Sequence, residues 1–94
     1  MKVAIIDGNI LAAIGLKQIL STVMPMMHID TFGTMAELHA NTPDTYFHFF
    51  ANTTIVLQDM AFFSRHRHKT IVLTTSTSDA TQLTGFHSLC TSQS

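Results

Sequence analysis

The chain has 94 residues, of which 46% are hydrophobic and 12% are charged, and its formal net charge is -1. A chain of this length forms one domain around one modest core, and its apolar content excludes intrinsic disorder. The near-neutral charge argues against strong nucleic-acid binding by this domain, because such binding needs a basic stripe.

Membrane and secretory signals are also missing from the sequence. The longest apolar stretch, residues 10–27, is interrupted by Lys17, Gln18 and Pro25, whereas a membrane span needs about 18 apolar residues in a row. We expect no signal peptide, and the single cysteine, Cys90, excludes an internal disulfide and a cysteine-rich zinc site. These features predict a cytoplasmic protein without membrane contact.

The first third of the chain predicts a strand, a helix and a second strand. Residues 3–6 form a continuous apolar run, which is typical of a parallel strand buried on both faces. Asn9 is a suitable N-cap for the helix that follows, and Pro25 ends that helix. Residues 28–32 alternate in polarity and predict the second strand. The helix carries an apolar stripe at helical spacing: Leu16, Ile19, Leu20 and Val23.

The middle of the chain predicts a short helix and an aromatic strand. Thr34 and Glu37 have the spacing of a capping box before a helix over residues 35–40. Residues 41–44 form a turn. Residues 46–50 are rich in aromatic side chains and predict the third strand.

The last part of the chain predicts two more strands. Residues 54–64 are ambiguous and are interpreted as a short helix. The polar connector 65–69 leads to a fourth strand at 70–73. A short helix or turn at 80–84 then precedes a last strand at 86–89.

This order of elements predicts an α/β fold, a three-layer sandwich around a parallel sheet with right-handed crossovers. The third and fourth crossovers are short, and the chain ends where a last helix should begin. We therefore expect one domain, residues 1–94, from the N-terminal part of a longer protein. The apolar surface left by the missing helix would explain the mean hydropathy of +0.26, but a merely oily small domain explains it equally well.

Two segments carry a resemblance to a known family. VAIIDGN at 3–9, followed by GLKQIL at 15–20, resembles the opening of response-regulator receiver domains, above all those joined to LuxR-type helix-turn-helix output domains. TIVLTT at 70–75 resembles the fourth strand of that family, which ends in a switch Thr or Ser. The resemblance follows the order of elements over the whole chain and implies a five-stranded sheet of flavodoxin-like or CheY-like order 2-1-3-4-5.

The resemblance also implies where a phosphorylation site would lie. In this family an acidic pair after strand one helps to hold Mg²⁺, and an Asp at the end of strand three accepts the phosphoryl group. A Thr or Ser after strand four and a Lys after strand five bind the phosphoryl oxygens. Mg²⁺ needs carboxylate oxygens in near-octahedral geometry, and the transferred group needs its charge compensated.

Most of these groups are replaced in this sequence. Asp7 matches the first acid, but Gly8 takes the place of the second. The phosphoacceptor position falls on Ala51, and neither Ala51 nor its neighbour Asn52 can form an acyl phosphate. One carboxylate cannot organise Mg²⁺ well. The resemblance therefore implies a degenerate receiver without a metal, a cofactor or catalytic residues.

The remaining positions of the site are only partly retained. Thr74 keeps the switch position, and Cys90 or one of its neighbours stands where the lysine should be. The degenerate phosphoacceptor pocket that we expect is formed by Asp7, Gly8, Ala51, Asn52, Thr74, Thr75 and Cys90.

The six histidines and the basic segment 65–69 invite a metal or anion hypothesis. His66 and His68 have no nearby carboxylate or cysteine that would complete a tetrahedral metal site, so a structural or solvated role is favoured. For the cations of residues 65–69, a solvated loop is favoured over an anion site. His48 lies among aromatic residues, where we expect a hydrogen-bonded core histidine.

These observations predict a phosphorylation-independent pseudo-receiver of a two-component-type response regulator, which is not an enzyme. It would act by protein–protein contact, as a homodimer or on an output domain of the same protein, and the full-length protein would be a DNA-binding transcription regulator. One alternative is a module that binds a small ligand in the crevice at the strand C-termini. Another is a phosphoacceptor that is still active through an unexpected residue.

Overall fold

A computed structural model of the chain describes residues 1–41, 43–74 and 87–90. Its elements are, in chain order, β1 (Lys2–Ile6), α1 (Ile10–Val23), β2 (His28–Phe32), α2 (Met35–His39), η1 (Pro43–Thr45), β3 (His48–Asn52), α3 (Thr53–Gln58), α4 (Met60–Arg65), η2 (Arg67–Lys69), β4 (Thr70–Thr74) and β5 (His87–Cys90). The helix or turn predicted at 80–84 and the segment where a last helix was expected to be missing lie outside the described residues. No helix in the described part is long and apolar enough to cross a membrane.

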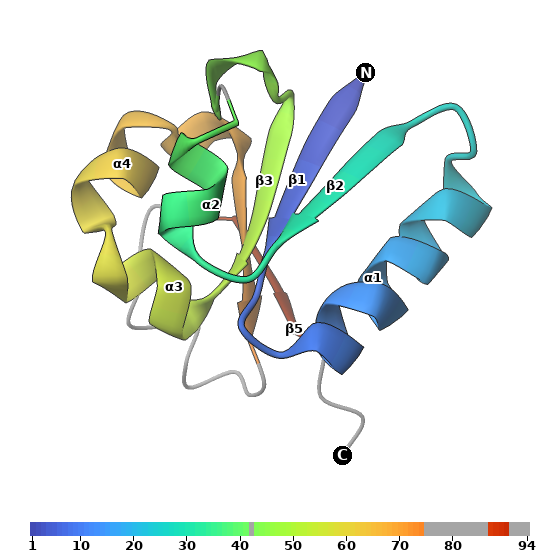
Figure 1. Ribbon diagram of the computed structural model, residues 1–94, viewed down its shortest axis with the longest axis horizontal. Helices are drawn as coiled ribbons and strands as arrows, with labels where there is room; N and C mark the ends of the chain where they lie inside the picture. The colour runs from blue at the N-terminus through green and yellow to red at the C-terminus, as the bar shows by residue number, and fades with distance from the viewer. Residues whose placement is uncertain (42, 75–86, 91–94) are drawn as a thin grey trace.

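The strands form one parallel sheet in the order β2-β1-β3-β4-β5 (Figure 1). The order β2-β1-β3-β4 is the one that the resemblance implied. The four-residue strand β5 continues the sheet beyond β4. The fold is therefore α/β with a parallel sheet, as the alternation of strands and helices predicted.

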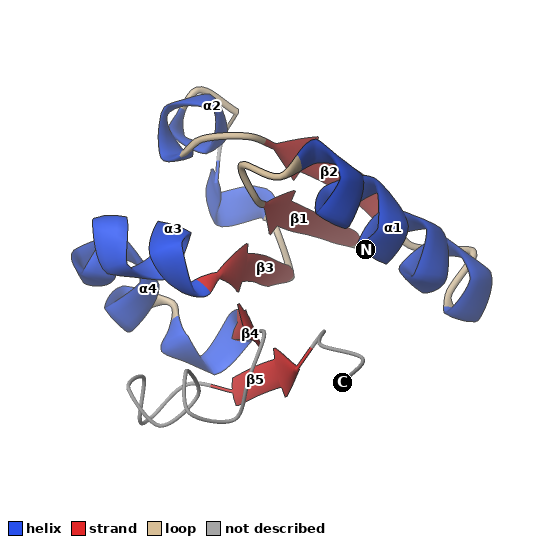
Figure 2. Ribbon diagram, turned by 90° about the horizontal axis from the view of Figure 1, so that it is seen from below, coloured by secondary structure: helices blue, strands red, loops and turns tan. Residues whose placement is uncertain are grey.

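Helices cover the two faces of the sheet unequally (Figure 2). Within the described residues, α2, α3 and α4 lie on one face and α1 lies on the other. Side chains alternate along each strand, so β1 contributes to two separate cores. The core under α2, α3 and α4 includes Ala4, Ile6, Leu38, Phe49, Ala51, Val56, Phe63 and Val72. The core under α1 includes Val3, Ile5, Leu16, Ile29, Phe50 and Leu73.

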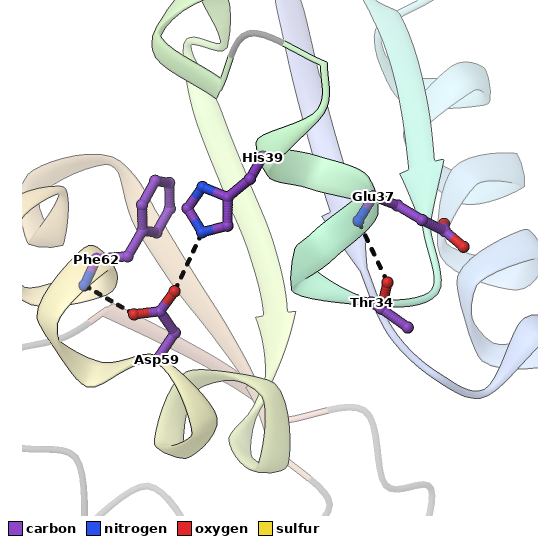
Figure 3. A network of polar contacts seen from close by, with 5 residues as sticks. All are labelled: Thr34, Glu37, His39, Asp59 and Phe62. Carbon is purple, nitrogen blue, oxygen red and sulfur yellow. Dashed lines mark hydrogen bonds and ion pairs between the residues drawn. The ribbon is translucent and has the colours of Figure 1, made fainter.

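Side chains cap α1 and α2 at the positions that the sequence predicted. Asn9 Oδ1 accepts a hydrogen bond from the backbone N–H of Ala12 at 3.2 Å. Thr34 Oγ1 accepts one from the N–H of Glu37 at 3.3 Å (Figure 3). Glu37 Oε2 in turn accepts from the N–H of Gly33 at 2.9 Å, so the capping box closes one residue before Thr34.

The predicted apolar stripe of α1 describes its buried side only in part. Ala13 and Leu16 are buried, and Leu20 packs against the same core. Ile19 and Val23 are 60% and 69% exposed, so their expected place in the stripe was wrong. The helix contacts the sheet along one narrow line of residues spaced three and four apart, which leaves the neighbouring apolar positions in solvent.

The third strand lies two residues later than predicted. Residues 46–50 were expected, but β3 comprises His48–Asn52. Tyr46 is buried before the strand begins, and its hydroxyl donates to Asp30 Oδ2 in β2 at 2.7 Å. The aromatic segment thus begins before the strand, and only Phe49 and Phe50 of its aromatic residues pair within β3. As a result, Asn52 is the last residue of the strand.

The helix predicted at 54–64 is two helices, α3 and α4, with Asp59 at the break. Asp59 has an extended φ of -141°, and its Oδ1 accepts a hydrogen bond from the N–H of Phe62 at 3.3 Å (Figure 3). A carboxylate that caps a new first turn ends the preceding helix, because the capping residue cannot be helical itself. The short third crossover therefore consists of α3, α4 and η2.

Candidate functional site

The C-terminal ends of β1, β2 and β3 surround a hollow of about 320 Å³, which we call the crevice. Its lining comes from residues 7–9 after β1, residues 33–34 after β2, Asn52 at the end of β3, and Thr54, Ile55 and Gln58 of α3. This edge lies at the bottom of the sheet in Figure 1, where the strand arrows of β1 and β3 end. In open parallel sheets it is the edge at which ligands bind.

The register of the sheet explains why Asp7 and Asn52 meet. Ile6 pairs with Ala51 across β1 and β3, so the residues that follow them also lie side by side. The apolar run of β1 ends at Ile6, and the first polar side chain after it is 7% exposed. This places a largely buried carboxylate at the floor of the crevice.

One oxygen of Asp7 is held by two hydrogen bonds. Asp7 Oδ1 accepts from the backbone N–H of Asn9 at 2.9 Å and from Nδ2 of Asn52 at 2.8 Å. The other end of the Asn52 side chain, Oδ1, accepts from the N–H of Ile55 at 2.8 Å and caps α3. Neutral donors thus compensate the buried carboxylate, and one side chain links β1 to α3.

Of the two neighbouring residues expected in the pocket at the end of the third strand, the structure places only Asn52 in the lining of the crevice. Ala51 is fully buried in the core under α2, α3 and α4 and does not line the crevice. Asn52 lies there instead, because β3 extends to that residue. The sequence had predicted that the third strand ends at Phe50. Gly8 lines the crevice beside Asp7, as expected of the pocket.

For the expected site residues of β4 and β5, the structure describes the backbone pairing and not the side chains. Thr74 ends β4 and pairs with Cys90 at the end of β5. Both therefore belong to the same edge of the sheet as Asp7. Thr75 lies outside the described residues, and so do the side chains of Thr74 and Cys90.

Sequence reasoning missed several residues that line the crevice. Asn9 and Thr34 were recognised only as helix caps, yet both also face the crevice. Thr54 and Gln58 were placed in an ambiguous helix. The available signal was position, because each polar residue directly after a buried parallel strand lies at the same edge of the sheet.

The side chains of the crevice do not match a divalent-cation site. Asp7 supplies the carboxylate, its Oδ1 already accepts two hydrogen bonds, and Gly8 has no side chain to add. Among the residues that the structure describes, no group of three or more His, Cys, Asp or Glu is arranged to hold a metal ion. Mg²⁺ is usually held by one or two carboxylates together with phosphate oxygens, and the described side chains of the crevice offer one carboxylate, whose Oδ1 already accepts two hydrogen bonds.

A polar bridge ties α2 to the helices on its side of the sheet. His39 Nε2 lies 3.2 Å from Asp59 Oδ2, and the His39 ring makes an edge contact with Phe62 at 5.2 Å between centroids (Figure 3). Asp59 directly follows Gln58, which lines the crevice. The bridge therefore links the α3–α4 junction to α2.

Comparison with solved structures identifies the fold. The structure of RcsB from Salmonella enterica serovar Typhimurium, bound to the promoter rprA in the presence of the phosphomimetic BeF3-, matches this chain with a TM-score of 0.75 and 15% identity. The match covers 100% of this chain and 55% of the RcsB chain, so the chain spans about half the length of that protein. No protein-family model and no curated protein matches the sequence. The chain has the CheY-like fold of response-regulator receiver domains.

Proposed function

We propose that this chain is a regulatory receiver-type module of a two-component-type regulator whose phosphorylation switch is disabled. It acts in the cytoplasm by binding protein, not by catalysis. The fold supports the regulatory part of the proposal, since it matches RcsB over the whole chain. The observation that carries the proposal is the hydrogen bond of 2.8 Å between Asn52 and Asp7 at the end of β3.

At a phosphorylation site a second carboxylate and a bound cation would lie beside Asp7, whereas here a neutral amide lies there. An acceptor carboxylate beside Asp7 would create two adjacent negative charges, which a bound cation would have to neutralise. The Asn52 amide is neutral, cannot form an acyl phosphate, and donates a hydrogen bond to Asp7 instead. The Asp7 carboxylate therefore has hydrogen-bond donors without a cation or a phosphoryl group. We propose that the domain does not switch between an unphosphorylated and a phosphorylated conformation.

The output of the regulator would lie elsewhere in a longer protein. RcsB was solved on promoter DNA, and this chain aligns with 55% of it. We propose that the full-length protein regulates transcription and that this domain contributes contacts to a second copy or to its own output domain. Exposed apolar side chains at the start of α1 support a contact surface: Ile10, Leu11 and Ile14 are 71%, 81% and 56% exposed.

The test compares the chain with the Asn52→Asp variant. Each is incubated with Mg²⁺ and a small phosphodonor, and intact mass and thermal stability are measured. The unmodified chain keeps its mass, and Mg²⁺ does not stabilise it. The variant loses stability because two carboxylates adjoin, and Mg²⁺ restores part of the loss by binding the native state.

The control is Asn41→Asp, which introduces the same charge at an exposed position at the end of α2. Mg²⁺ should leave this control unchanged. A phosphoryl adduct on the unmodified chain would overturn the proposal and would support the rival hypothesis of an active phosphoacceptor.

The crevice also supports a second candidate function, the binding of a small polar ligand. Its volume of about 320 Å³ and its lining of amide, hydroxyl and carboxylate groups would suit such a molecule. Thermal stabilisation that saturates with a metabolite and disappears in the Asn52→Ala variant would favour this function over the pseudo-receiver.

A further inference from the structure

A second hollow lies at the opposite edge of the sheet from the crevice. It has a volume of about 320 Å³ and is lined by Tyr46, Phe47, His48, His68 and Lys69; we call it the basic hollow. The first three residues lead into β3 and the other two lead into β4, near the top of Figure 1. His48 and Asn52 are the two ends of β3, so roughly 13 Å of strand separates the hollows.

The basic hollow contains one lysine, Lys69, whose ammonium group forms no ion pair with a carboxylate of the described residues. Lys69 Nζ donates one hydrogen bond, to the carbonyl oxygen of Tyr46 at 3.0 Å, and an ammonium group has three donors. Asp30 is already engaged by the Tyr46 hydroxyl and the His28 ring. Among the side chains that the structure describes, no lysine or arginine takes part in an ion pair.

Aromatic rings form the walls of the same hollow. Phe47 is 58% exposed although it is a large apolar side chain, and its ring makes an edge contact with His48 at 4.7 Å between centroids. Tyr46, which also lines the hollow, packs on the buried ring of Phe49 with 6.0 Å between the ring centroids. A planar ring that enters the hollow would cover Phe47 and gain edge or stacked contacts with Phe47 and His48.

His48, which lines the hollow, has one buried ring nitrogen without a partner. His48 Nδ1 is buried without a hydrogen bond, which corrects the expectation of a hydrogen-bonded core histidine. Folding normally satisfies buried polar atoms, and the exceptions tend to mark sites of function or of bound water. His68 also lines the hollow, is exposed, and brings a second imidazole ring to it.

We propose that the basic hollow binds a small aromatic carboxylate. The ring of the ligand lies against Phe47 and His48, and its carboxylate accepts charge-assisted hydrogen bonds from Lys69 and His68. The volume falls at the lower end of the roughly 300–1,000 Å³ that ligand sites span, which limits the ligand to one ring with short substituents. This site is independent of the crevice and of the proposed pseudo-receiver role.

The experiment is an amide-resolved NMR titration of the chain at constant ionic strength with three probes. Sodium benzoate carries both the ring and the charge, inorganic phosphate carries the charge alone, and benzyl alcohol carries the ring alone. Benzoate should give saturable shifts at residues 46–48 and 68–70, with an affinity at least about tenfold higher than either other probe, because two contacts each worth about 1.4 kcal/mol or more are combined.

Three variants assign the contacts. Phe47→Ala and His68→Ala change exposed side chains and should each weaken benzoate binding several-fold while the fold is kept. Lys69→Met should weaken it about tenfold, the loss of one charge-assisted hydrogen bond. Lys17→Met, which removes a cation from the exposed side of α1, is the matched control and should bind benzoate as the unmodified chain does.

Three results would overturn the proposal. Equal affinity for benzoate and phosphate would indicate non-specific attraction of anions. Shifts that never saturate, or that map to the crevice, would place no site in the basic hollow. An effect of Lys17→Met as large as that of Lys69→Met would show that net charge alone controls the response.

Discussion

The Asn52 side chain is shared between the sheet and a helix, since its amide nitrogen donates to Asp7 and its oxygen accepts from Ile55. Removing this side chain therefore breaks two hydrogen bonds at once. A buried carboxylate loses a donor, and α3 loses its N-cap. Few single side chains in the described residues combine two such contacts.

We expect Asn52→Ala to lower the free energy of unfolding by about 2–3 kcal/mol, the sum of a lost cap and a lost donor to a buried charge. Urea denaturation measures the change. Asn41→Ala is the control, because Asn41 is exposed and its side chain donates a hydrogen bond to the carbonyl oxygen of Glu37; the loss in this variant should stay within about 1 kcal/mol. Equal losses in the two variants would contradict the assigned role of Asn52.

Tyr46 and Asp30 make stability depend on pH at both ends of the scale. The hydrogen bond from Tyr46 lowers the pKa of Asp30 below its usual 3.8. Burial, followed by the bond to Asp30, raises the pKa of Tyr46 to about 12. The carboxylate therefore stabilises the fold above its unfolded pKa, and this contribution is lost as the pH falls through its folded pKa. The phenol stabilises the fold below about pH 10 and loses this contribution as the pH rises towards 12.

Tyr46→Phe should flatten both limbs of the pH–stability profile. As the pH falls below about 4, the free energy of unfolding of the variant is expected to decrease less than that of the unmodified chain. The same difference is expected as the pH rises above about 10. Chemical denaturation across the pH range measures both slopes. Parallel profiles for the two proteins would show that this hydrogen bond does not couple folding to protonation.

At the scale of elements, the junction of α3 and α4 shows how one polar residue divides a helix. Asp59 caps α4 through Phe62 and also faces His39 of α2 (Figure 3). The capping bond is local, whereas the contact with His39 joins elements twenty residues apart in sequence. The two roles should differ in strength.

We expect Asp59→Ala to cost about 1–2 kcal/mol of stability through the lost cap. The coupling between Asp59 and His39 in a double-mutant cycle should stay below about 1 kcal/mol, because their side chains are 31% and 46% exposed and water screens the pair. Thermal or urea unfolding of the two single variants and the double variant gives both values. A coupling larger than the cap term would contradict this ranking.

At the scale of the whole molecule, the two faces of the sheet differ in cover. Three helices lie over one face and α1 over the other within the described residues. The exposed apolar side chains at the start of α1 belong to the less covered side. A surface of this kind is more typical of a protein contact than of a free monomer.

The chain should therefore associate with itself as its concentration rises. Light scattering over a concentration series is expected to show dimers at micromolar concentration, and Ile14→Lys should return the chain to the monomer. Ala36→Lys adds the same charge on exposed α2, across the sheet, and should leave the dimer intact. A monomer throughout the series would remove self-association from the proposed function and leave the output domain as its partner.

The sequence by itself determined the features that depend on near neighbours in the chain. Helix caps at Asn9 and Thr34, the buried run before Asp7, and the order of strands and helices follow from contacts within a few residues or from apolar runs. These patterns also predicted that Asp7 and Gly8 would lie at the C-terminal edge of the sheet, where the structure places them.

Only the tertiary structure decided which side chains meet across the fold. Tyr46 was predicted as a strand residue, but it lies before β3, and its hydroxyl donates a hydrogen bond to Asp30 of β2. The sequence predicted that Asp7 and Asn52 would meet, and the structure adds the hydrogen bond of 2.8 Å between them. The exposed positions of α1 depend on how much of the helix the sheet can cover. The basic hollow brings together residues before two different strands. Pairings of this kind depend on register and packing between distant segments, which local patterns do not encode.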